Sequence, residues 1–501
     1  MLQRQITTPP PTPNGDLHVG HLAGPYLAAD VFFRSEELAG RTPSYHFVTD
    51  DNQSYVQSKA LERGITPASL IDSAFRSMLE TMASCNLRPA LVRQADDYIV
   101  FIQDFFTALF ETGAVARKSI PVLLCPETNV ALFEANVSGS CPTCLAVTAG
   151  GICETCGHPN LPSSLVTPSS KSSLGKAPIE AEMEIYCLEL ERYRSQLANL
   201  LYNEVHSRPS LDRLMRQLLS KPLADFPLTF PSTWGIPAPF PGAEGQVLNP
   251  WGEIYAGQIY ALERGSQRST RFEDVVGRLN TSPSGSRLVQ FLGFDNSYFY
   301  GIVHPSIAFA MGEKFPLPAA LVTNEFYELD GSKFSTSKDH LIWAKDISAK
   351  YDIDFVRLYL ARTNPSCQIT SFSQNDFENW VQTQIIAPLE VMYGLLSEVT
   401  RDVRNCVASP SPATRRAIDN VCTHMVQGYQ LEQFELRHVA ETFERSLQWA
   451  AERAVRPKGT ESSQCIVNFS LLKIGEAIQP LCPTLGAKLA AKDPTALSWK
   501  R

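Results

Sequence analysis

Two histidines one helical turn apart give the start of the chain its most distinctive chemistry. They are His18 and His21, with Gly20 between them, and they follow a proline-rich segment and the turn pair Asn14-Gly15. A helix that begins here offers unpaired backbone N–H groups and positive potential, which suit a phosphate. The imidazoles add hydrogen-bond donors, and the glycine leaves room for a flat base. The stretch predicts a phosphate site, and an ordinary helix with two surface histidines is the alternative.

A second polar stretch, about 300 residues later, strengthens the phosphate prediction. Residues 330–338 form a glycine-initiated loop that carries Lys333 and Lys338 together with several hydroxyl groups. Ammonium groups and backbone N–H donors can close over a triphosphate. A solvated turn is the alternative for a short run of this kind.

Four cysteines in the middle of the chain are spaced as metal ligands. Cys141 and Cys144 form one Cys-x-x-Cys pair, and Cys153 and Cys156 form the other. Each pair presents two thiolates to one centre, and two pairs make a tetrahedral zinc site. Two disulfides are the alternative, but the other cysteines are scattered and the composition is that of a cytoplasmic chain. We therefore expect a structural zinc ion.

Composition limits the possible classes of protein. The chain has 501 residues, of which 44% are hydrophobic and 19% charged, so two or more globular domains are expected. No apolar run predicts a membrane span or a signal peptide, and the cytoplasm is the expected location. The net charge of −8 argues against a generally basic nucleic-acid binder but leaves room for a local patch.

Hydrophobic periodicity predicts an α/β first part and a helical end. Strands are expected at 44–49, 288–292 and 319–323, with helices at 67–85 and 98–112. Polar residues follow two of these strands, Asp51 after the first and Gly293 and Asp295 after the second. In a parallel sheet such positions are ligand-site candidates, and capping a helix is the alternative role for each aspartate. After residue 345 the chain is expected to be mainly helical, with apolar residues at helical spacing over 375–405, 413–455 and 463–491, which predicts a bundle.

The histidine and lysine stretches together resemble the paired signatures of class I aminoacyl-tRNA synthetases. Within that class the chain is most similar to methionyl-tRNA synthetases. The similar segments run over nearly the full length; they are Pro13-Asn14-Gly15, Phe47–Thr49, the two cysteine pairs, Trp234–Pro237, Trp251, Gly293-x-Asp295, Lys333–Ser335 and Ile478–Pro483.

The resemblance implies an architecture and a reaction. The fold is a Rossmann-type doubly wound parallel sheet split by a zinc-knuckle insertion, with a C-terminal α-helical bundle. The implied domains are two Rossmann catalytic halves (1–118 and 241–325), a connective insertion (119–240), a lysine-loop and stem-contact segment (326–380) and an anticodon-binding-like domain (381–501). The implied reaction activates an amino acid with ATP and Mg²⁺ and transfers it to tRNA.

The resemblance also implies roles for individual residues. Those implied in catalysis are His18, His21, Lys333 and Lys338. Those implied in ATP binding are Asn14, Gly20, Gly293, Asp295, Ser335 and Thr336. Those implied in amino-acid binding are Thr12, Asp51, Trp251, Tyr255, Gln258 and Tyr300, with Asp51 on the α-ammonium group. The zinc ligands are Cys141, Cys144, Cys153 and Cys156.

Several positions depart from the family pattern. Thr336 stands where the family loop has its second lysine, and we expect Lys338 to compensate. Thr12, Gln258 and Tyr300 give the amino-acid pocket a different size and polarity, which leaves the amino acid open. Two further functions therefore stay in view: a ligase that passes the activated amino acid to a small-molecule or carrier acceptor, and a catalytically silent RNA-binding relic.

Overall fold

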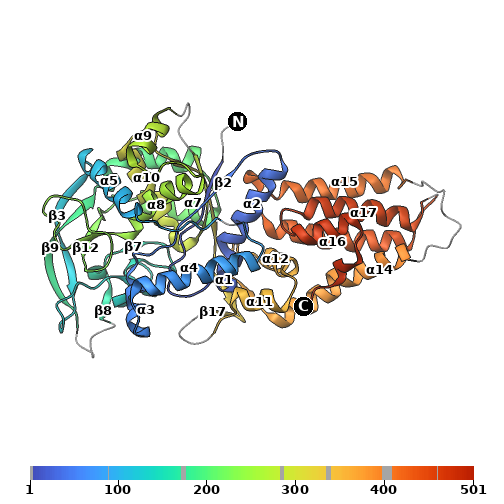
Figure 1. The fold of residues 1–501 in the computed structure, drawn as a ribbon, viewed down its shortest axis with the longest axis horizontal. Coiled ribbons are helices and arrows are strands. Elements are labelled where there is room, and N and C mark those ends of the chain that lie inside the picture. Colours follow the sequence, from blue (N-terminus) through green and yellow to red (C-terminus); the bar gives the residue numbers. More distant parts are fainter. Residues whose placement is uncertain are drawn as a thin grey trace. The chain divides into compact units, whose positions relative to one another are not determined.

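The computed structural model describes residues 4–88, 90–170, 177–281, 287–334, 340–397, 409–459 and 461–500. The chain divides into two compact units, each assembled from separate segments (Figure 1). Unit 1 comprises residues 1–16, 42–79 and 89–323, and unit 2 comprises residues 17–41, 80–88 and 324–501. The predicted five-domain division remains a prediction.

A five-stranded sheet organises unit 1. Its order is β10-β15-β14-β1-β2, and the strands are β1 (Gln5–Thr7), β2 (Ser44–Tyr45), β10 (His206–Ser207), β14 (Arg287–Gly293) and β15 (Leu317–Asn324). β1 pairs in parallel with β2 and β14, and β10 pairs in parallel with β15. Strands therefore lie on both sides of β1, which is the doubly wound order. The strand predicted at 44–49 is shorter than expected, because after Tyr45 only Phe47 continues the pairing, as a bridge to Leu91.

The helices of unit 1 supply its hydrophobic core. The core gathers aromatic and aliphatic side chains from α5, α7, α8 and α10. The helices are α3 (Ser54–Arg63), α5 (Tyr98–Glu111), α6 (Arg194–Asn199), α7 (Pro209–Leu219), α8 (Pro250–Gly265), α9 (Phe272–Thr281) and α10 (His304–Met311), and α4 (Pro67–Ser84) begins in this unit. α8 is buried over nearly its whole length, so its polar side chains must find partners inside the unit.

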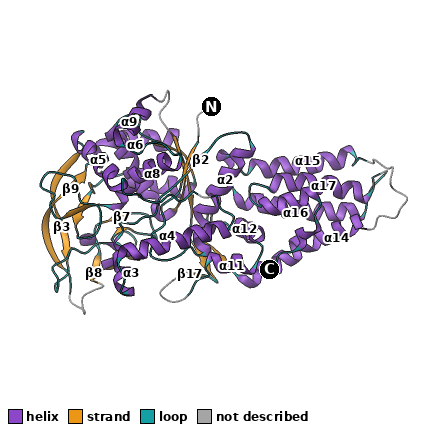
Figure 2. Ribbon diagram, in the orientation of Figure 1, coloured by secondary structure: helices purple, strands orange, loops and turns teal. Residues whose placement is uncertain are grey.

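The insertion within unit 1 is built from antiparallel strands. β3 (Val115–Leu124) and β9 (Ile179–Leu188) pair over ten residues and form the long strands in Figure 2. Between them lie the cysteine pairs and short strands. These strands are β4 (Val137–Ser140), β5 (Val147–Thr148), β6 (Gly151–Ile152), β7 (Pro159–Asn160) and β8 (Val166–Ser170), and after β9 come β11 (Phe226–Pro227), β12 (Thr229–Pro231) and β13 (Gln246–Leu248).

Unit 2 combines the histidine helix, a small sheet and the helical end of the chain. The histidine helix is made of α1 (Val19–His21) and α2 (Leu27–Leu38), joined by η1 (Leu22–Tyr26), where non-helical backbone angles at Gly24 kink the chain. The small sheet has the order β17-β16-β18, from β16 (Tyr327–Leu329), β17 (Ser332–Lys333) and β18 (Thr370–Phe372). None of the helices in the described ranges combines the length and apolar composition that a membrane crossing needs.

The helical end of unit 2 is a bundle, as predicted. α16 packs on α14, α15 and α17 (Figure 1), and the contacts of the chain also place α17 against α18. The helices after the small sheet are α11 (Ala344–Lys350), α12 (Ile353–Arg362), α13 (Gln374–Trp380), α14 (Ala387–Ser397), α15 (Pro412–Gln427), α16 (Leu436–Val455), α17 (Ser463–Ile478) and α18 (Pro483–Ala491).

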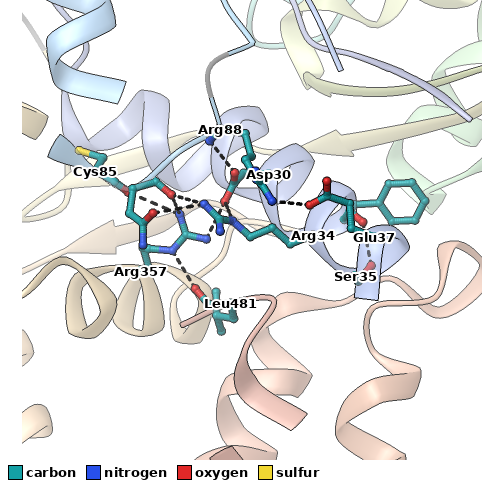
Figure 3. Close-up of polar contacts among 10 residues, drawn as sticks. Asp30, Arg34, Ser35, Glu37, Cys85, Arg88, Arg357 and Leu481 are labelled. Carbon is teal, nitrogen blue, oxygen red and sulfur yellow. Dashed lines mark hydrogen bonds and ion pairs between the residues drawn. The ribbon is translucent and has the colours of Figure 1, made fainter. Parts of the chain in front are cut away.

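A buried ion-pair network ties the histidine helix to the rest of unit 2 (Figure 3). Arg357 of α12 donates to Asp30 of α2 at 2.7 Å and to the carbonyl oxygen of Leu481 at 2.7 Å. Asp30 also accepts from the Arg34 side chain and from the backbone N–H of Arg88, each at 2.8 Å. Because the buried Asp30 carboxylate accepts from all three groups and Arg357 also binds the Leu481 carbonyl, the network holds α2, α12 and the chain before α18 in one arrangement.

Candidate active site

The two histidines lie at the beginning of a helix in unit 2. α1 starts at Val19, and His18 is its N-cap. The backbone N–H of His18 donates to Nδ1 of His21 at 3.2 Å, and the two rings stack with centroids 3.9 Å apart. Because Nδ1 of His21 accepts this bond, a neutral His21 carries its proton on Nε2. His21 is thus set as an N–H donor from Nε2.

His18 is held between two rings. One neighbour is His21, and the other is Phe334, whose ring lies 4.7 Å from the His18 ring and nearly parallel to it. Burial, and then the nearby His21, lower the pKa of His18 to about 2, so its imidazole is neutral near pH 7. A side chain on Gly20 would come within 3.0 Å of both His18 and Phe334. A larger residue there would force the two rings to shift by a few tenths of an ångström.

The residues on either side of the lysine loop contact the histidine segment through ring stacking and backbone hydrogen bonds. Lys333 ends a β16–β17 hairpin whose turn residues, Asp330 and Gly331, both have positive φ, as a tight Asp-Gly turn requires. Its ammonium nitrogen lies 4.6 Å from the ring centre of Phe326. After the loop, the N–H of Val19 donates to Ile342 and the N–H of Ala344 donates to Leu17. Ser335, Thr336 and Lys338 lie outside the described residues.

The aspartates after the first strand of unit 1 lie among buried carboxylates. Burial raises the pKa of Asp51 to about 6, and the Thr49 hydroxyl and Arg93 oppose that rise. Burial, followed by Glu253, raises the pKa of Asp50 well above its usual value. Glu253 accepts from Asn52 at 2.7 Å and from Tyr98 at 2.9 Å, and its pKa is about 7 because it is buried. A cluster short of positive charge suits a ligand ammonium group.

Trp251 is fixed at the start of α8. Its ring stacks on Phe299 with centroids 4.0 Å apart, and its indole N–H donates to Glu134 at 2.5 Å. Its carbonyl oxygen accepts from Nε2 of His304 at 2.9 Å. Burial lowers the pKa of His304 to about 4, which keeps this imidazole neutral. Trp251 is therefore oriented from three sides.

The remaining predicted pocket residues are distributed over unit 1. Gln258 accepts from Gln290 at 3.0 Å, and Gln290 also donates to Thr7 at 3.3 Å. The Tyr300 ring lies 4.6 Å from the ring of His304, while the Tyr255 hydroxyl is bonded to the carbonyl of Pro316. Thr12 is half-buried in the turn that leads to Asn14. Their roles remain predictions.

The predicted nucleotide residues of unit 1 lie at two turns. Gly293 ends β14, and a side chain on it would come within 2.4 Å of the Asp295 carboxylate. Glycine there lets Asp295 fold back over the strand end, where Asn296 donates to it at 3.1 Å. Asn14 is exposed in a turn, and its backbone N–H donates to the carbonyl oxygen of Thr12.

Three side chains around this site escaped sequence reasoning. Glu134 accepts from the indole of Trp251, and Glu253 accepts from Asn52, the residue after Asp51. His304 binds the main-chain carbonyl of Trp251 at the start of α8. Glu253 could have been suspected, because it is a carboxylate in the first turn of a helix whose next four residues are Ile254, Tyr255, Ala256 and Gly257. Nothing in the local sequence singles out Glu134.

The four cysteines of the insertion form one cluster. Their sulfur atoms all lie within 4.8 Å of one another, with 3.8 Å between Cys141 and Cys156 and 3.6 Å between Cys144 and Cys153. A tetrahedral zinc ion with bonds of about 2.3 Å separates its sulfur ligands by about 3.8 Å. Every described cysteine is a free thiol, so the disulfide alternative is wrong for these four. The donor set therefore fits zinc.

We expect substitution of Cys141 by serine to abolish zinc binding. With one ligand missing, the remaining thiolates hold the ion far more weakly, and the insertion loses the folding energy that the metal supplies. Metal analysis should give about one zinc per native chain and almost none in the variant. The control is Cys367→Ser, which changes an exposed thiol in unit 2 and should keep its zinc. A native protein purified without metal contradicts the assignment.

The family comparison gives an independent finding. The family model described as tRNA synthetases class I (M) matches residues 4–393. The methionine–tRNA ligase of Methanosphaera stadtmanae is 29% identical over 379 residues, covering 75% of this chain and 54% of the relative. The methionine–tRNA ligase of Roseiflexus sp. (strain RS-1) is 29% identical over 444 residues, covering 84% of this chain and 74% of the relative. The chain thus spans about half the length of the first of these relatives.

A solved structure has a similar fold. Mycobacterium tuberculosis methionyl-tRNA synthetase bound to methionyl-adenylate superposes with a TM-score of 0.75 at 16% identity. The match covers 97% of this chain and 93% of that one. At this low sequence identity, the superposition supports a shared fold and nothing further.

Proposed function

The chain belongs to the class I tRNA synthetases of the methionyl type, and on that premise we propose that it activates an amino acid with ATP and transfers it to tRNA, as a methionine–tRNA ligase does. In the first step the amino-acid carboxylate attacks the α-phosphorus of ATP, an oxygen–phosphorus bond forms and pyrophosphate leaves. In the second, a 3′-terminal hydroxyl of tRNA takes the acyl group and AMP leaves. The curated relatives whose names carry this activity support the proposal.

The observation that carries the proposal is the stack of His18 on Phe334. It joins the segment that carries His18 and His21 to Phe334, the residue that follows Lys333. Nε2 of His21 offers an N–H donor and Lys333 an ammonium group, and both suit charge that develops on phosphoryl oxygens. ATP enters as its Mg²⁺ complex in this proposal, and the metal neutralises part of that charge.

The amino-acid end of the reaction falls to unit 1. Asp51 binds the α-ammonium group, and its pKa of about 6 leaves it mostly ionised at pH 7. Trp251, Tyr300 and Gln258 border the side chain of the amino acid. The helical bundle of unit 2 carries the tRNA contacts.

ATP–pyrophosphate exchange with each of the twenty amino acids tests the proposal. We expect exchange with methionine, followed by charging of total tRNA. The KM for the amino acid should rise as the pH falls through about 6, because Asp51 is then protonated and loses its attraction for the ammonium group. The KM for ATP is the control.

Two outcomes contradict the proposal. Exchange without charging of tRNA points to another acceptor for the activated amino acid. Absence of exchange with any amino acid points to a catalytically silent RNA-binding protein.

A further inference from the structure

One side chain connects the zinc-bearing insertion to the residues around Trp251. Glu134 lies in the short helical turn η2 (Glu134–Asn136), shortly before the first cysteine pair. Its carboxylate accepts the indole N–H of Trp251 at 2.5 Å and the hydroxyl of Ser54 at 3.2 Å. Burial raises the pKa of Glu134 to about 7, while both donors oppose that rise. The carboxylate therefore meets α8 and α3 at one point.

The backbone around Glu134 is held in an unusual conformation. Its φ is +36°, a region that residues with a side chain rarely adopt. The N–H of Ala135 donates to Ser54 at 3.2 Å, and Ser58 donates to Asn136 at 3.4 Å. These contacts dock the turn on α3, which begins three residues after Asp51. Non-glycine residues keep such backbone angles where their surroundings fix them, often at ligand sites.

The packing around Trp251 leaves its indole incompletely surrounded. A cavity of about 840 Å³ opens in unit 1, and Glu134, Trp251 and Phe299 all line it. The Phe299 stack fixes the plane of the ring, and His304 fixes the main chain beneath it. With empty space alongside, the hydrogen bond to Glu134 is the contact that sets the direction of the N–H edge.

We propose that Glu134 is a positioning residue of the amino-acid pocket, whose carboxylate orients the Trp251 indole. Through this bond the insertion contributes to the affinity for the amino acid without touching it. The inference rests on the proposed function, because Trp251 is a pocket residue only in that proposal.

The kinetic test compares two substitutions of Glu134. We expect Glu134→Ala to raise the KM for methionine in ATP–pyrophosphate exchange about tenfold, the effect of losing one good hydrogen bond. The kcat and the KM for ATP should stay within about twofold. Glu134→Gln keeps an acceptor oxygen for the indole and should restore most of the affinity. The control, Glu180→Gln, removes an exposed carboxylate of β9 in the same insertion and should change nothing. Equal effects on both substrates overturn the proposal.

A double-mutant cycle shows whether Glu134 acts through the indole. Trp251→Phe keeps a ring on Phe299 but removes the N–H. In that background Glu134→Ala should have no further effect on the KM for methionine. Effects of the two substitutions that simply multiply contradict the proposal, since independent sites are additive in free energy.

A spectroscopic measurement separates this inference from the proposed function. The chain has six tryptophans, and ¹⁵N labelling gives an indole N–H signal for each. The signal missing from Trp251→Phe belongs to Trp251. Glu134→Ala should move that proton signal upfield, while Glu134→Gln should move it far less. An unmoved signal overturns the inference even in an active enzyme, and the expected shift upholds the positioning contact even if no exchange is detected.

Discussion

Replacing Lys333 by alanine is expected to lower kcat for ATP–pyrophosphate exchange by about 10²–10³-fold, the usual effect of removing one preorganised group that meets developing charge. The hairpin turn before Lys333 and the residue after it fix the position of the Lys333 backbone. Asp330 and Gly331 close the turn, and Phe334 is stacked on His18. The hairpin backbone does not need the lysine side chain, so the melting temperature should be nearly unchanged.

A matched control uses Lys473, which lies on the surface of α17 and pairs with Glu476. Lys473→Ala removes the same charge from unit 2 and should leave exchange within about twofold, because exposed ion pairs contribute little. Full activity of Lys333→Ala would mean that the histidine segment does not act with this loop. Lys338→Ala should also lower exchange, because the chain has Thr336 where its family has a second lysine, and this stays a prediction.

The local parts of the site could be predicted from the sequence because local residues determine them. Histidines spaced by three, an Asp-Gly turn before a lysine, and cysteine pairs separated by two residues each carry their geometry in the chain itself. The structure places His18 and His21 at a helix start and the four sulfurs in one cluster. The strands expected near residues 288 and 319 are present as β14 and β15.

The parts that sequence reasoning missed depend on contacts between distant segments. Glu134 meets Trp251 across 117 residues of chain. Asn52 meets Glu253 across 201. The strand that begins at Ser44 is short because the residues after Tyr45 do not continue a regular ladder. Phe47 forms an isolated bridge with Leu91, and the backbone N–H of Asp50 donates to the carbonyl oxygen of Pro11. Helix and strand patterns do not specify which distant partner a buried polar group will find.

The network around Arg357 is a third example of such distant contacts, and it has mechanical consequences. Its guanidinium donates to Asp30, to the carbonyl of Leu481 and to the carbonyl of Asn86 at 3.1 Å. The Arg357 side chain is 2% exposed and that of Asp30 is 0% exposed. Asp30 belongs to α2, which follows the two histidines after the kink at Gly24. The network therefore fixes α2 against α12 and against the chain between α17 and α18.

We expect Arg357→Leu to lower the free energy of unfolding by about 3–5 kcal/mol, because it breaks a buried ion pair and leaves the Asp30 carboxylate with Arg34 as its remaining guanidinium partner. Urea unfolding followed by far-ultraviolet circular dichroism measures the change, since unit 2 is mainly helical. Arg362→Leu on the same helix is the control; its partners Glu441 and Glu444 are partly exposed, so the loss should stay below about 1 kcal/mol.

Adding Asp30→Leu to Arg357→Leu should restore part of the lost stability, because the double variant no longer buries a carboxylate that has lost one of its two guanidinium partners. If the double variant is less stable than Arg357→Leu by the full amount of a second independent loss, then hydrogen bonding by Asp30 to Arg34 and Arg88 matters more than its charge pair with Arg357. The effect on function is measured as the KM for ATP of Arg357→Leu, at a temperature where the variant is folded. A rise there, with the amino-acid KM unchanged, is the expected result, because α2, which follows the histidine segment, loses an anchor.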